Sequence, residues 1–224
     1  APALESASLL TAKSGDEIKE QLFVLEKRST EELALRFDLT VPFTRMFVAK
    51  QRELAKGTKW FGLSRMWRYE APQKGRAREF YQLSAELFGC DNAQAVAECI
   101  NLQIACLKNL GLSADDVKVR ANNRMLLEGM IKAVTGSEKF EEVTKVIDKI
   151  KKISEQAFVS ELEKLGIDAT KAAELRALTA MKGTPSQILD TLEKDLELND
   201  TAKKGIADLR ALVAFVPQDF FVLD

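Results

Sequence analysis

Two aromatic-rich segments, joined by a short basic connection, constrain the fold of this chain most strongly. The segments are residues 59–70 and 79–89, and residues 71–78 connect them. Both have the composition of β-strands, and a connection this short between two strands favours an antiparallel hairpin. We therefore predict a long hairpin whose tip is charged.

The charge at this tip is local. The chain as a whole has a formal net charge of -1, so no general field would draw it onto an anionic partner. The segment 65–79 concentrates its cations, which are Arg65, Arg68, Lys74, Arg76 and Arg78, against Glu70 and Glu79. Cations this close together repel one another unless an anion joins them. The loop is therefore suited to hold a polyphosphate beside a flat ring.

Strand alternation extends this loop into a surface. Residues two apart on a strand share a face, so one face carries Phe80, Gln82, Ser84 and Glu86, and the other carries Tyr81, Leu83, Ala85 and Leu87. The same parity places Arg68 and Glu70 with the polar set. We expect the apolar face to be core. On the polar face a guanidinium can bind phosphate or carboxylate, Phe80 can stack on a base, and Gln82 with Glu86 can bind a small polar or cationic group.

Two other interpretations of the same pattern remain open at this point. A charged face on an antiparallel strand is commonly the solvated side of a half-buried sheet. A basic hairpin tip could also bind RNA phosphates instead of a nucleotide.

Composition excludes several classes of protein. The chain has 224 residues, of which 46% are hydrophobic and 30% charged, which argues against disorder. It has no histidine, which excludes a Ser-His triad and His-ligated zinc within it; no metal ligands are expected. Residues 211–216 are too short an apolar run to span a membrane, and the first ten residues do not resemble a signal peptide. We expect Cys90, Cys99 and Cys106 to be buried reduced thiols of an intracellular protein.

The remaining segments predict an α+β fold. We expect a hairpin over residues 21–37, a helix from Pro42 through Leu54, a helix over 92–110 and a short strand over 117–121. About five helical patterns follow in residues 122–215. Within them Thr184, Pro185 and Gln187 have the spacing of a capping box. Residues 219–224 predict one more strand.

Three motifs carry a specific resemblance. The sequence WRYEAPQKGRAREFYQLSAELFG resembles the second signature motif of class II aminoacyl-tRNA synthetases in its histidine-specific form. The segment LALRFDLTVPFTR resembles the amino-acid-binding segment, and PALE resembles the end of the first motif. They occur in the order and spacing of the histidyl-tRNA synthetase family. The sequence RFDLTVPF and the helical segment after it are most similar to the archaeal and eukaryotic-type branch of that family.

The resemblance implies a role for each matching residue. Arg68 would bridge the ATP α-phosphate and the histidine carboxylate as the electrostatic catalyst of adenylation. Glu70 would contact the adenine edge, Phe80 would stack on the ring, Arg76 would hold the terminal phosphates and Arg78 would support the loop. The α-ammonium and the imidazole of histidine would be bound by Asp38, Leu39, Thr40, Gln82 and Glu86. Leu39 and Thr40 could equally be helix-entry residues before Pro42.

The resemblance also implies an organisation and partners. Residues 1–121 would form a partial class II catalytic domain with an antiparallel sheet, residues 122–215 an all-helical insertion domain, and residues 216–224 a return strand of that sheet. The third motif and the anticodon-binding domain are missing from the match, so we interpret the chain as a fragment whose own activity would be very low. Expected partners are histidine, ATP with Mg²⁺, histidine tRNA and, as in the full-length family, a second subunit. We expect a cytoplasmic location and no membrane association.

Two further hypotheses compete with a ligase. One is a synthetase-like regulatory subunit that senses histidine without charging tRNA; an intact ATP loop argues against it. The other is a pseudo-synthetase that binds uncharged tRNA, for which degenerate motifs would be expected. The insertion shows only one cluster of cations, Lys149, Lys151 and Lys152, and solvated helix residues explain it more simply than tRNA contact.

Overall fold

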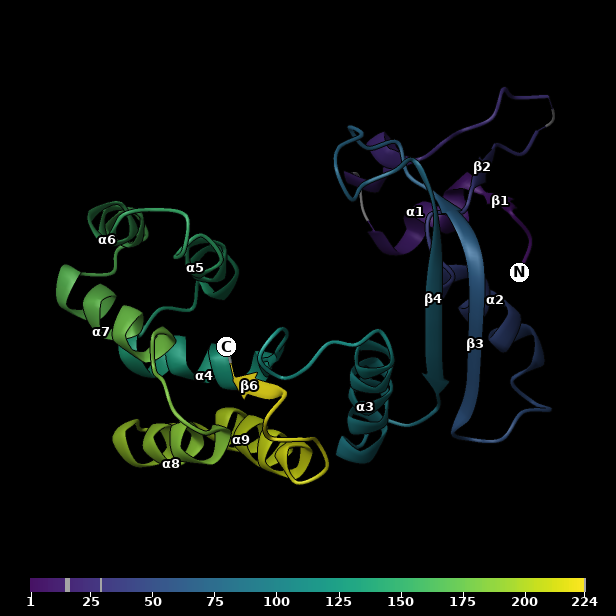
Figure 1. Ribbon diagram of the computed structural model, residues 1–224. Helices are drawn as coiled ribbons and strands as arrows, with labels where there is room; N and C mark the ends of the chain where they lie inside the picture. The colour runs from purple at the N-terminus through teal and green to yellow at the C-terminus, as the bar shows by residue number, and fades with distance from the viewer. Residues whose placement is uncertain (15–16, 29, 224) are drawn as a thin grey trace. The chain divides into compact units, whose positions relative to one another are not determined.

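The computed structural model of the chain describes residues 1–14, 17–28 and 30–223. It divides into two compact units, Ala1–Asp91 and Asn92–Asp224, which Figure 1 shows in purple to dark teal and in teal to yellow respectively. The mixture of helices and small sheets confirms the predicted α+β class. The domain boundaries at residues 121 and 215 stay a prediction.

The first unit is built on the predicted long hairpin. Its elements in chain order are β1 (Leu4–Ser6), α1 (Ala7–Ser14), η1 (Glu17–Gln21), β2 (Leu33–Leu35), α2 (Thr40–Lys50), β3 (Thr58–Trp67) and β4 (Glu79–Phe88). The strands β3 and β4 pair antiparallel from Thr58↔Phe88 to Trp67↔Glu79. A hydrogen bond of 3.0 Å from Arg68 N to Arg78 O continues the pairing toward the tip. The hairpin and its charged connection are therefore confirmed.

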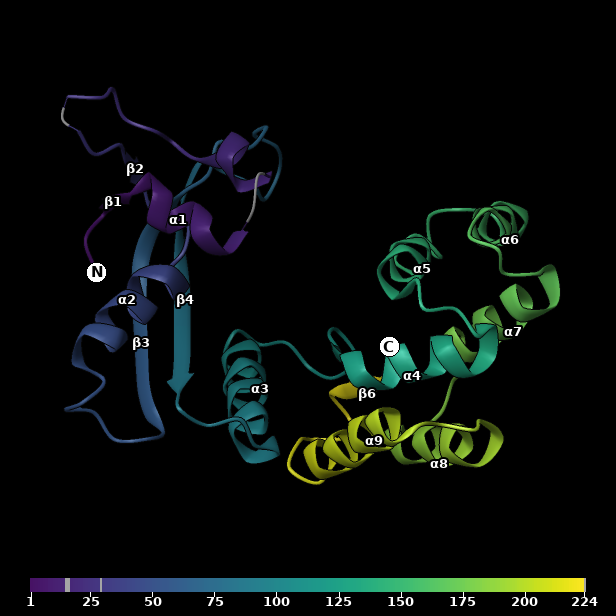
Figure 2. The same cartoon turned by 180° about the vertical axis from the view of Figure 1, so that it is seen from behind.

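The helix α2 covers one face of this hairpin. It lies behind the two strands in Figure 1 and in front of them in Figure 2. Leu39, Phe43 and Met66 form a buried cluster there. Gly62 makes the close approach possible, because a Cβ at this position would lie 3.0 Å from Leu39 Cδ1 and 3.1 Å from Phe43 Cζ.

The covered face is the polar one, which corrects our expectation for the hairpin. Ser84 is buried and Gln82 and Glu86 are half-buried, whereas Phe61, Leu63, Tyr81 and Leu83 of the other face are 79%, 66%, 64% and 49% exposed. Alternation separates the two faces correctly. It does not tell which of them a helix elsewhere in the chain will cover, and here Gly62 lies on the polar side.

The segments before the hairpin follow the sequence closely. Residues 21–37 form the expected hairpin-like pairing, with hydrogen bonds of 2.9 Å from Leu25 N to Leu33 O and 3.0 Å from Leu35 N to Phe23 O. Residue 29 lies outside the described residues. The helix α2 begins at Thr40, two residues before Pro42, and ends at Lys50 instead of Leu54. The hydrogen bond from Glu53 N to Lys50 O shows that the chain turns there.

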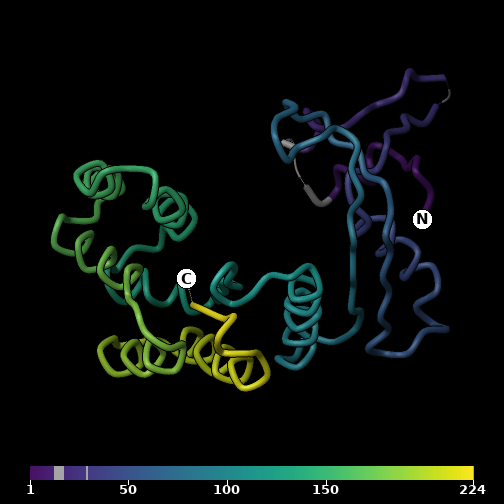
Figure 3. The backbone as a smooth tube through the Cα atoms, viewed as in Figure 1, coloured from purple at the N-terminus to yellow at the C-terminus, as the bar shows by residue number. Residues whose placement is uncertain are grey.

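The second unit is mostly helical. Its elements are α3 (Ala93–Asn109), β5 (Val119–Ala121), α4 (Arg124–Thr135), α5 (Phe140–Ile147), α6 (Glu155–Lys164), α7 (Ala169–Thr179), α8 (Pro185–Asp195), α9 (Asp200–Val213) and β6 (Phe221–Leu223). Figure 3 follows the chain through them, from the teal helix α3 to the yellow end. The strand β6 pairs with β5 in parallel, so residues 117–121 and 219–223 each contain a strand as predicted. Asp224 lies outside the described residues.

Apolar stripes on these helices form separate cores within the unit. One core surrounds Phe158 and Leu162, and another surrounds Leu189 and Ile206. Thr184 and Gln187 form the predicted capping box at the start of α8, with Pro185 in its first turn. The helices α4 and α9 approach closely at glycines, because a Cβ at Gly129 would lie 2.2 Å from Ala202 Cβ.

Two expectations for individual residues are wrong. Lys149, Lys151 and Lys152 lie in a turn between α5 and α6, not in a helix, because the chain breaks the helical pattern after Ile147. Cys90 and Cys99 are exposed, and Cys106 is half-buried. Cys99 and Cys106 both lie on α3, but Ala97 and Ile104 supply the buried side of this helix. Among the residues that the structure describes, no helix is long and apolar enough to cross a membrane.

Candidate functional site

The inner face of the hairpin brings the predicted polar residues together. In the register of β3 and β4, Trp60 is opposite Glu86, Ser64 is opposite Gln82, and Met66 is opposite Phe80. Alternation keeps Phe80, Gln82, Ser84 and Glu86 on the side that faces α2. A row of functional groups thus runs along one strand beneath the start of a helix.

Arg68 occupies the tip end of this row. Its Nε donates a hydrogen bond of 3.3 Å to Phe37 O, and its Nη2 donates one of 3.4 Å to Gln82 Oε1. Its guanidinium carbon lies 5.2 Å from the centroid of the Phe80 ring, within the range of a cation–π contact. Gln82 Nε2 in turn donates to Ser84 Oγ at 3.2 Å. Arg68 is therefore held by the hairpin and by the backbone that leads into α2, in a geometry that can present donors to an anion.

Glu86 occupies the other end of the row and is held by the start of α2. Thr40 Oγ1 donates a hydrogen bond of 2.7 Å to Glu86 Oε1. Asp38 Oδ1 accepts a hydrogen bond of 3.1 Å from Thr40 N, which is the interaction of an Asx turn before a helix. Carboxylates at both positions give this end of the face an acceptor character. Such a group suits a cation or an N–H donor.

Leu39 contributes differently from its neighbours. Its side chain is 1% exposed and packs with Phe43 and Met66, so only its backbone could contact a ligand. The alternative interpretation, that Leu39 and Thr40 are helix-entry residues, agrees with their positions. Leu39 is the N-cap and Thr40 is the first residue of α2. The structure adds the hydrogen bond to Glu86, which gives Thr40 a second part in the site.

The connection between the strands forms a shallow hollow. A cavity of about 360 Å³ is lined by Gln21, Tyr69, Glu70, Ala71, Pro72, Gln73 and Arg76. Arg76 Nη1 lies 3.6 Å from Glu70 Oε2. Arg78 donates a hydrogen bond of 3.2 Å to Glu70 O and stacks at 4.2 Å over the Tyr69 ring. Arg78 thus supports the loop, and Glu70 and Arg76 face the hollow as a pair that an entering anion could rearrange.

Arg65 does not belong to this site, although it is close in sequence. It lies on the exposed face, where it donates hydrogen bonds of 3.0 Å each to Tyr81 Oη and Glu79 Oε1. The hydrogen bond to Tyr81, followed by the charges of that side chain and of Glu79, raises the pKa of Arg65 above its usual value. The cations of the tip are therefore divided between the two faces of the hairpin.

Buried charged residues that the sequence analysis did not identify support the backbone next to the site. The first of them is Arg36. Arg36 is 7% exposed and donates hydrogen bonds to the carbonyl oxygens of Ala1, Pro2 and Arg65 at 2.5, 2.7 and 3.2 Å. Burial lowers the pKa of Arg36, and the nearby Glu5 carboxylate partly opposes this shift. The signal in the sequence was an arginine between the apolar residues Leu35 and Phe37.

Glu5 and Arg45 form the second part of this support. Arg45 Nη2 lies 2.7 Å from Glu5 Oε1, and the Glu5 side chain is only 7% exposed. The pair connects β1 to α2. Since α2 carries Thr40 at its start, this buried charge helps to fix the helix that covers the candidate site.

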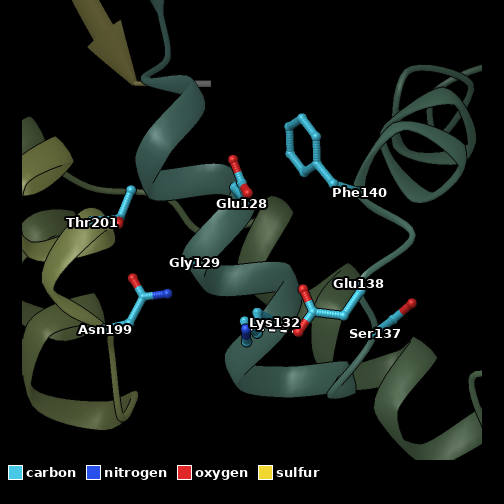
Figure 4. Close-up of a pocket in the computed structure, with 8 residues that line it drawn as sticks. All are labelled: Glu128, Gly129, Lys132, Ser137, Glu138, Phe140, Asn199 and Thr201. Atoms are coloured by element: carbon cyan, nitrogen blue, oxygen red, sulfur yellow. Dashed lines mark ion pairs between the residues drawn. The ribbon is translucent and has the colours of Figure 1, made fainter.

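The helical unit has a polar cavity of its own, which Figure 4 shows. Its volume is about 220 Å³, and it is lined by Glu128, Gly129, Lys132, Ser137, Glu138, Phe140, Asn199 and Thr201. Its cation is already neutralised, because Lys132 Nζ lies 2.7 Å from Glu138 Oε1. None of the predicted site residues lies here. Among residues 1–14, 17–28 and 30–223, moreover, no group of three or more acidic or cysteine side chains is arranged to hold a metal ion.

Solved structures share this fold over the whole chain. A histidyl-tRNA synthetase from Nostoc sp. PCC 7120 superposes with a TM-score of 0.82 at 24% identity, covering 100% of this chain and 52% of that one. A Bacillus halodurans protein, described as an ATP phosphoribosyltransferase regulatory subunit/histidyl-tRNA synthetase, superposes with a TM-score of 0.79 at 23% identity, covering 100% and 57%. The chain therefore shares the fold of these two proteins.

Sequence comparison identifies the family. The family model described as "Histidyl-tRNA synthetase" matches residues 1–220. The histidine–tRNA ligases of Haloarcula marismortui and Clostridium tetani are 36% identical over 171 residues and 34% identical over 218 residues. These matches cover 76% and 96% of the chain, but only 39% and 48% of the relatives. The chain belongs to the histidyl-tRNA synthetase family and spans less than half the length of these relatives.

Proposed function

We propose that this chain supplies the ATP-binding and histidine-binding hairpin of a histidine–tRNA ligase. The observation that carries the proposal is the row on the inner face of the hairpin. Arg68, in cation–π contact with Phe80, lies at one end, and Glu86, held by Thr40, lies at the other. An anion-binding donor, a stacking ring and a fixed carboxylate on one face suit the two substrates of amino-acid activation.

In the proposed reaction, a carboxylate oxygen of histidine attacks the α-phosphorus of ATP. The bond from that phosphorus to the bridging oxygen of the β-phosphate breaks, and pyrophosphate leaves with the electron pair. Negative charge builds on the phosphoryl oxygens between these events. Arg68 would offset that charge, because a fixed guanidinium stabilises it without reorganisation of solvent. Transfer of the histidyl group to its tRNA would follow and release AMP.

The remaining residues bind and orient in this proposal. Phe80 would stack on adenine, Glu70 would bind its edge, and Arg76 would hold the terminal phosphates with Arg78 supporting the loop. Arg76 is paired with Glu70 at 3.6 Å, so both would exchange partners when ATP enters. The histidine side would be formed by Asp38, the Leu39 backbone, Thr40, Gln82 and Glu86, with Glu86 accepting a hydrogen bond from the imidazole.

Magnesium would accompany ATP in this account. The part of the chain that the structure describes has no cluster of three ligating side chains, and Mg²⁺ is commonly held by one or two carboxylates together with substrate phosphates. The ion would neutralise phosphate charge when bound. Homodimer formation, tRNA binding by the helical unit and a cytoplasmic location are part of the proposal as properties expected of the family.

A second candidate is a histidine-sensing regulatory subunit without ligase activity. The likeness to the Bacillus halodurans protein at a TM-score of 0.79 shows that this fold is shared with a protein so described. The arrangement of Arg68, Phe80 and Arg76 favours the ligase, because sensing histidine alone would not require a polyphosphate loop.

The test is histidine-dependent exchange of pyrophosphate into ATP, measured on the polypeptide of family length that contains this sequence. The ligase predicts exchange stimulated by histidine and not by the other amino acids. Histidine binding by calorimetry without any exchange would reject the ligase and favour the regulatory subunit. Exchange stimulated equally by several amino acids would reject the histidine-binding role of Glu86.

A further inference from the structure

Ser84 lies in the middle of the candidate site, yet neither the family motifs nor the proposed chemistry gives it a task. It is 8% exposed and lies between Gln82 and Glu86 on the inner face of β4. Its partner across the hairpin is Gly62. A Cβ at Gly62 would lie 3.0 Å from Leu39 Cδ1, so the start of α2 packs directly over this place and removes the serine from water.

The hydroxyl of Ser84 ends a row of hydrogen bonds that begins at Arg68. Arg68 Nη2 donates to Gln82 Oε1 at 3.4 Å, and Gln82 Nε2 donates to Ser84 Oγ at 3.2 Å. A guanidinium has donors only, whereas a hydroxyl can accept. Rotating the amide of Gln82 by half a turn would place its NH₂ group against the guanidinium, donor against donor. Arg68 therefore admits one orientation of this amide, and in that orientation Gln82 Nε2 donates to the Ser84 hydroxyl, which anchors the amide.

That orientation determines what a ligand meets. Gln82 Oε1 has a second lone pair beyond the one that accepts from Arg68. At the other end of the face, Glu86 is held by Thr40 at 2.7 Å. The Gln82 amide is thus held by the Ser84 hydroxyl, and the Glu86 carboxylate by the Thr40 hydroxyl. A face with two fixed acceptors recognises ligand groups that carry N–H donors, such as an ammonium or an imidazole N–H.

We propose that Ser84 is a positioning residue for the amino-acid substrate, acting through the side-chain amide of Gln82. The Ser84 hydroxyl keeps Gln82 Oε1 directed toward Arg68 and the ligand. Without it, Gln82 Nε2 loses its partner in a half-buried place, and the amide samples other rotamers. This inference rests on the proposed function for the identity of the ligand, but not for the geometry of the amide.

The kinetic test compares four variants in histidine-dependent exchange on the family-length polypeptide: Ser84→Ala, Ser84→Thr, Gln82→Ala and the double variant Gln82→Ala/Ser84→Ala. Ser84→Ala should raise the KM for histidine about 2- to 10-fold, the effect of one neutral hydrogen bond, with the KM for ATP unchanged. Ser84→Thr keeps the hydroxyl and should restore the KM. In the Gln82→Ala background, Ser84→Ala should add nothing, because the residue through which it acts is gone.

A merely structural role predicts a different pattern. Ser84→Ala would then weaken the binding of both histidine and ATP and lower the melting temperature. Its effect would be the same in the wild-type and in the Gln82→Ala background. That result would overturn the proposal. If Ser84→Thr does not fold because its extra methyl is crowded, the comparison in the Gln82→Ala background still decides.

A second measurement does not depend on the ligand and separates failure of this inference from failure of the proposed function. In the 224-residue chain, hydrogen exchange of the Gln82 side-chain NH₂ can be followed by ¹⁵N NMR. It should be slower in the wild type than in Ser84→Ala. Equal exchange rates would overturn the inference whether or not the protein activates histidine, whereas absent histidine activation with a protected amide would reject only the proposed function.

Discussion

Thr40 Oγ1 donates a hydrogen bond of 2.7 Å to Glu86 Oε1 and thereby connects the first residue of α2 to the end of the polar row on β4. The two residues are separated by 46 positions in the sequence. Both are half-buried. A carboxylate held in this way presents its other oxygen in a fixed direction, as recognition of a single N–H donor requires.

Replacing Thr40 by valine should therefore weaken histidine binding while preserving the shape of the side chain. Loss of a hydrogen bond to a charged group is worth about 1.5–3 kcal/mol, or roughly 10- to 150-fold in affinity. The measurement is the dissociation constant for histidine by calorimetry. Thr40→Ser keeps the hydroxyl and is the matched control, expected to stay near the wild-type value. Equal losses in both variants would show that the hydroxyl does not act through Glu86.

The pair formed by Glu5 and Arg45 should stabilise the first unit. Arg45→Met leaves the buried Glu5 carboxylate without its 2.7 Å partner. An unpaired buried polar group costs about 1–3 kcal/mol, and we expect the lower half of that range because the Arg45 side chain is 42% exposed. Denaturant unfolding measures the change in the free energy of unfolding. Arg52→Met, at an exposed arginine after α2, should change it by no more than about 0.5 kcal/mol.

The crossing of α4 and α9 should not tolerate a side chain at Gly129. Gly129→Ala would place a Cβ 2.2 Å from Ala202 Cβ, so the helices must separate at a cost of about 1–3 kcal/mol or more. The double variant Gly129→Ala/Ala202→Gly removes the opposing methyl and should recover part of the loss. Hydrogen exchange of backbone amides in the second unit measures the stability of the single and the double variant. A double variant that is less stable than the sum of the single changes would contradict the steric explanation.

Asp116 should titrate below its usual range. Its Oδ2 accepts hydrogen bonds of 2.6 Å from Ser113 Oγ and 2.8 Å from Ser113 N. These bonds to the serine side chain and backbone favour the charged form and lower the pKa of Asp116. Since the folded-state pKa is lower than the unfolded one, the contribution to stability is present above the unfolded pKa and is lost as the pH falls through the folded pKa. Carboxyl ¹³C NMR should show this, and Ser113→Ala should raise the pKa toward its ordinary value.

Much of the fold could be predicted because its signals are local. Alternation in residues 79–88 separates the two faces of β4, and the spacing of Thr184 and Gln187 defines the start of α8. The burial of each face depends instead on tertiary packing. The sequence around Gly62 does not indicate that α2 covers the polar side of the hairpin. Tyr81 and Leu83, which were expected in the core, are therefore exposed.

In the candidate site, too, the local pattern could be predicted and the tertiary contacts could not. Arg68, Phe80, Gln82 and Glu86 could be grouped from strand parity alone. The hydrogen bond from Thr40 to Glu86 and the buried network of Arg36 could not, because each joins segments distant in the sequence. For Arg65 the sequence suggested a contact that the structure does not show. Arg65 was grouped with Arg68 because the two are close in sequence, but strand alternation places them on opposite faces of the hairpin.

The most direct test of the central claim compares Arg68→Ala with Arg65→Ala in histidine-dependent pyrophosphate exchange on the family-length polypeptide. Both variants remove one guanidinium from the same hairpin, but Arg68 lies on the face with Gln82, and Arg65 lies on the other with Glu79 and Tyr81. We predict that Arg68→Ala lowers the exchange rate by about 10²- to 10³-fold, as expected for loss of a group that stabilises the transition state. Arg65→Ala should stay within about twofold of the wild type, since exposed ion pairs contribute little. Equal rates for the two variants would contradict the account.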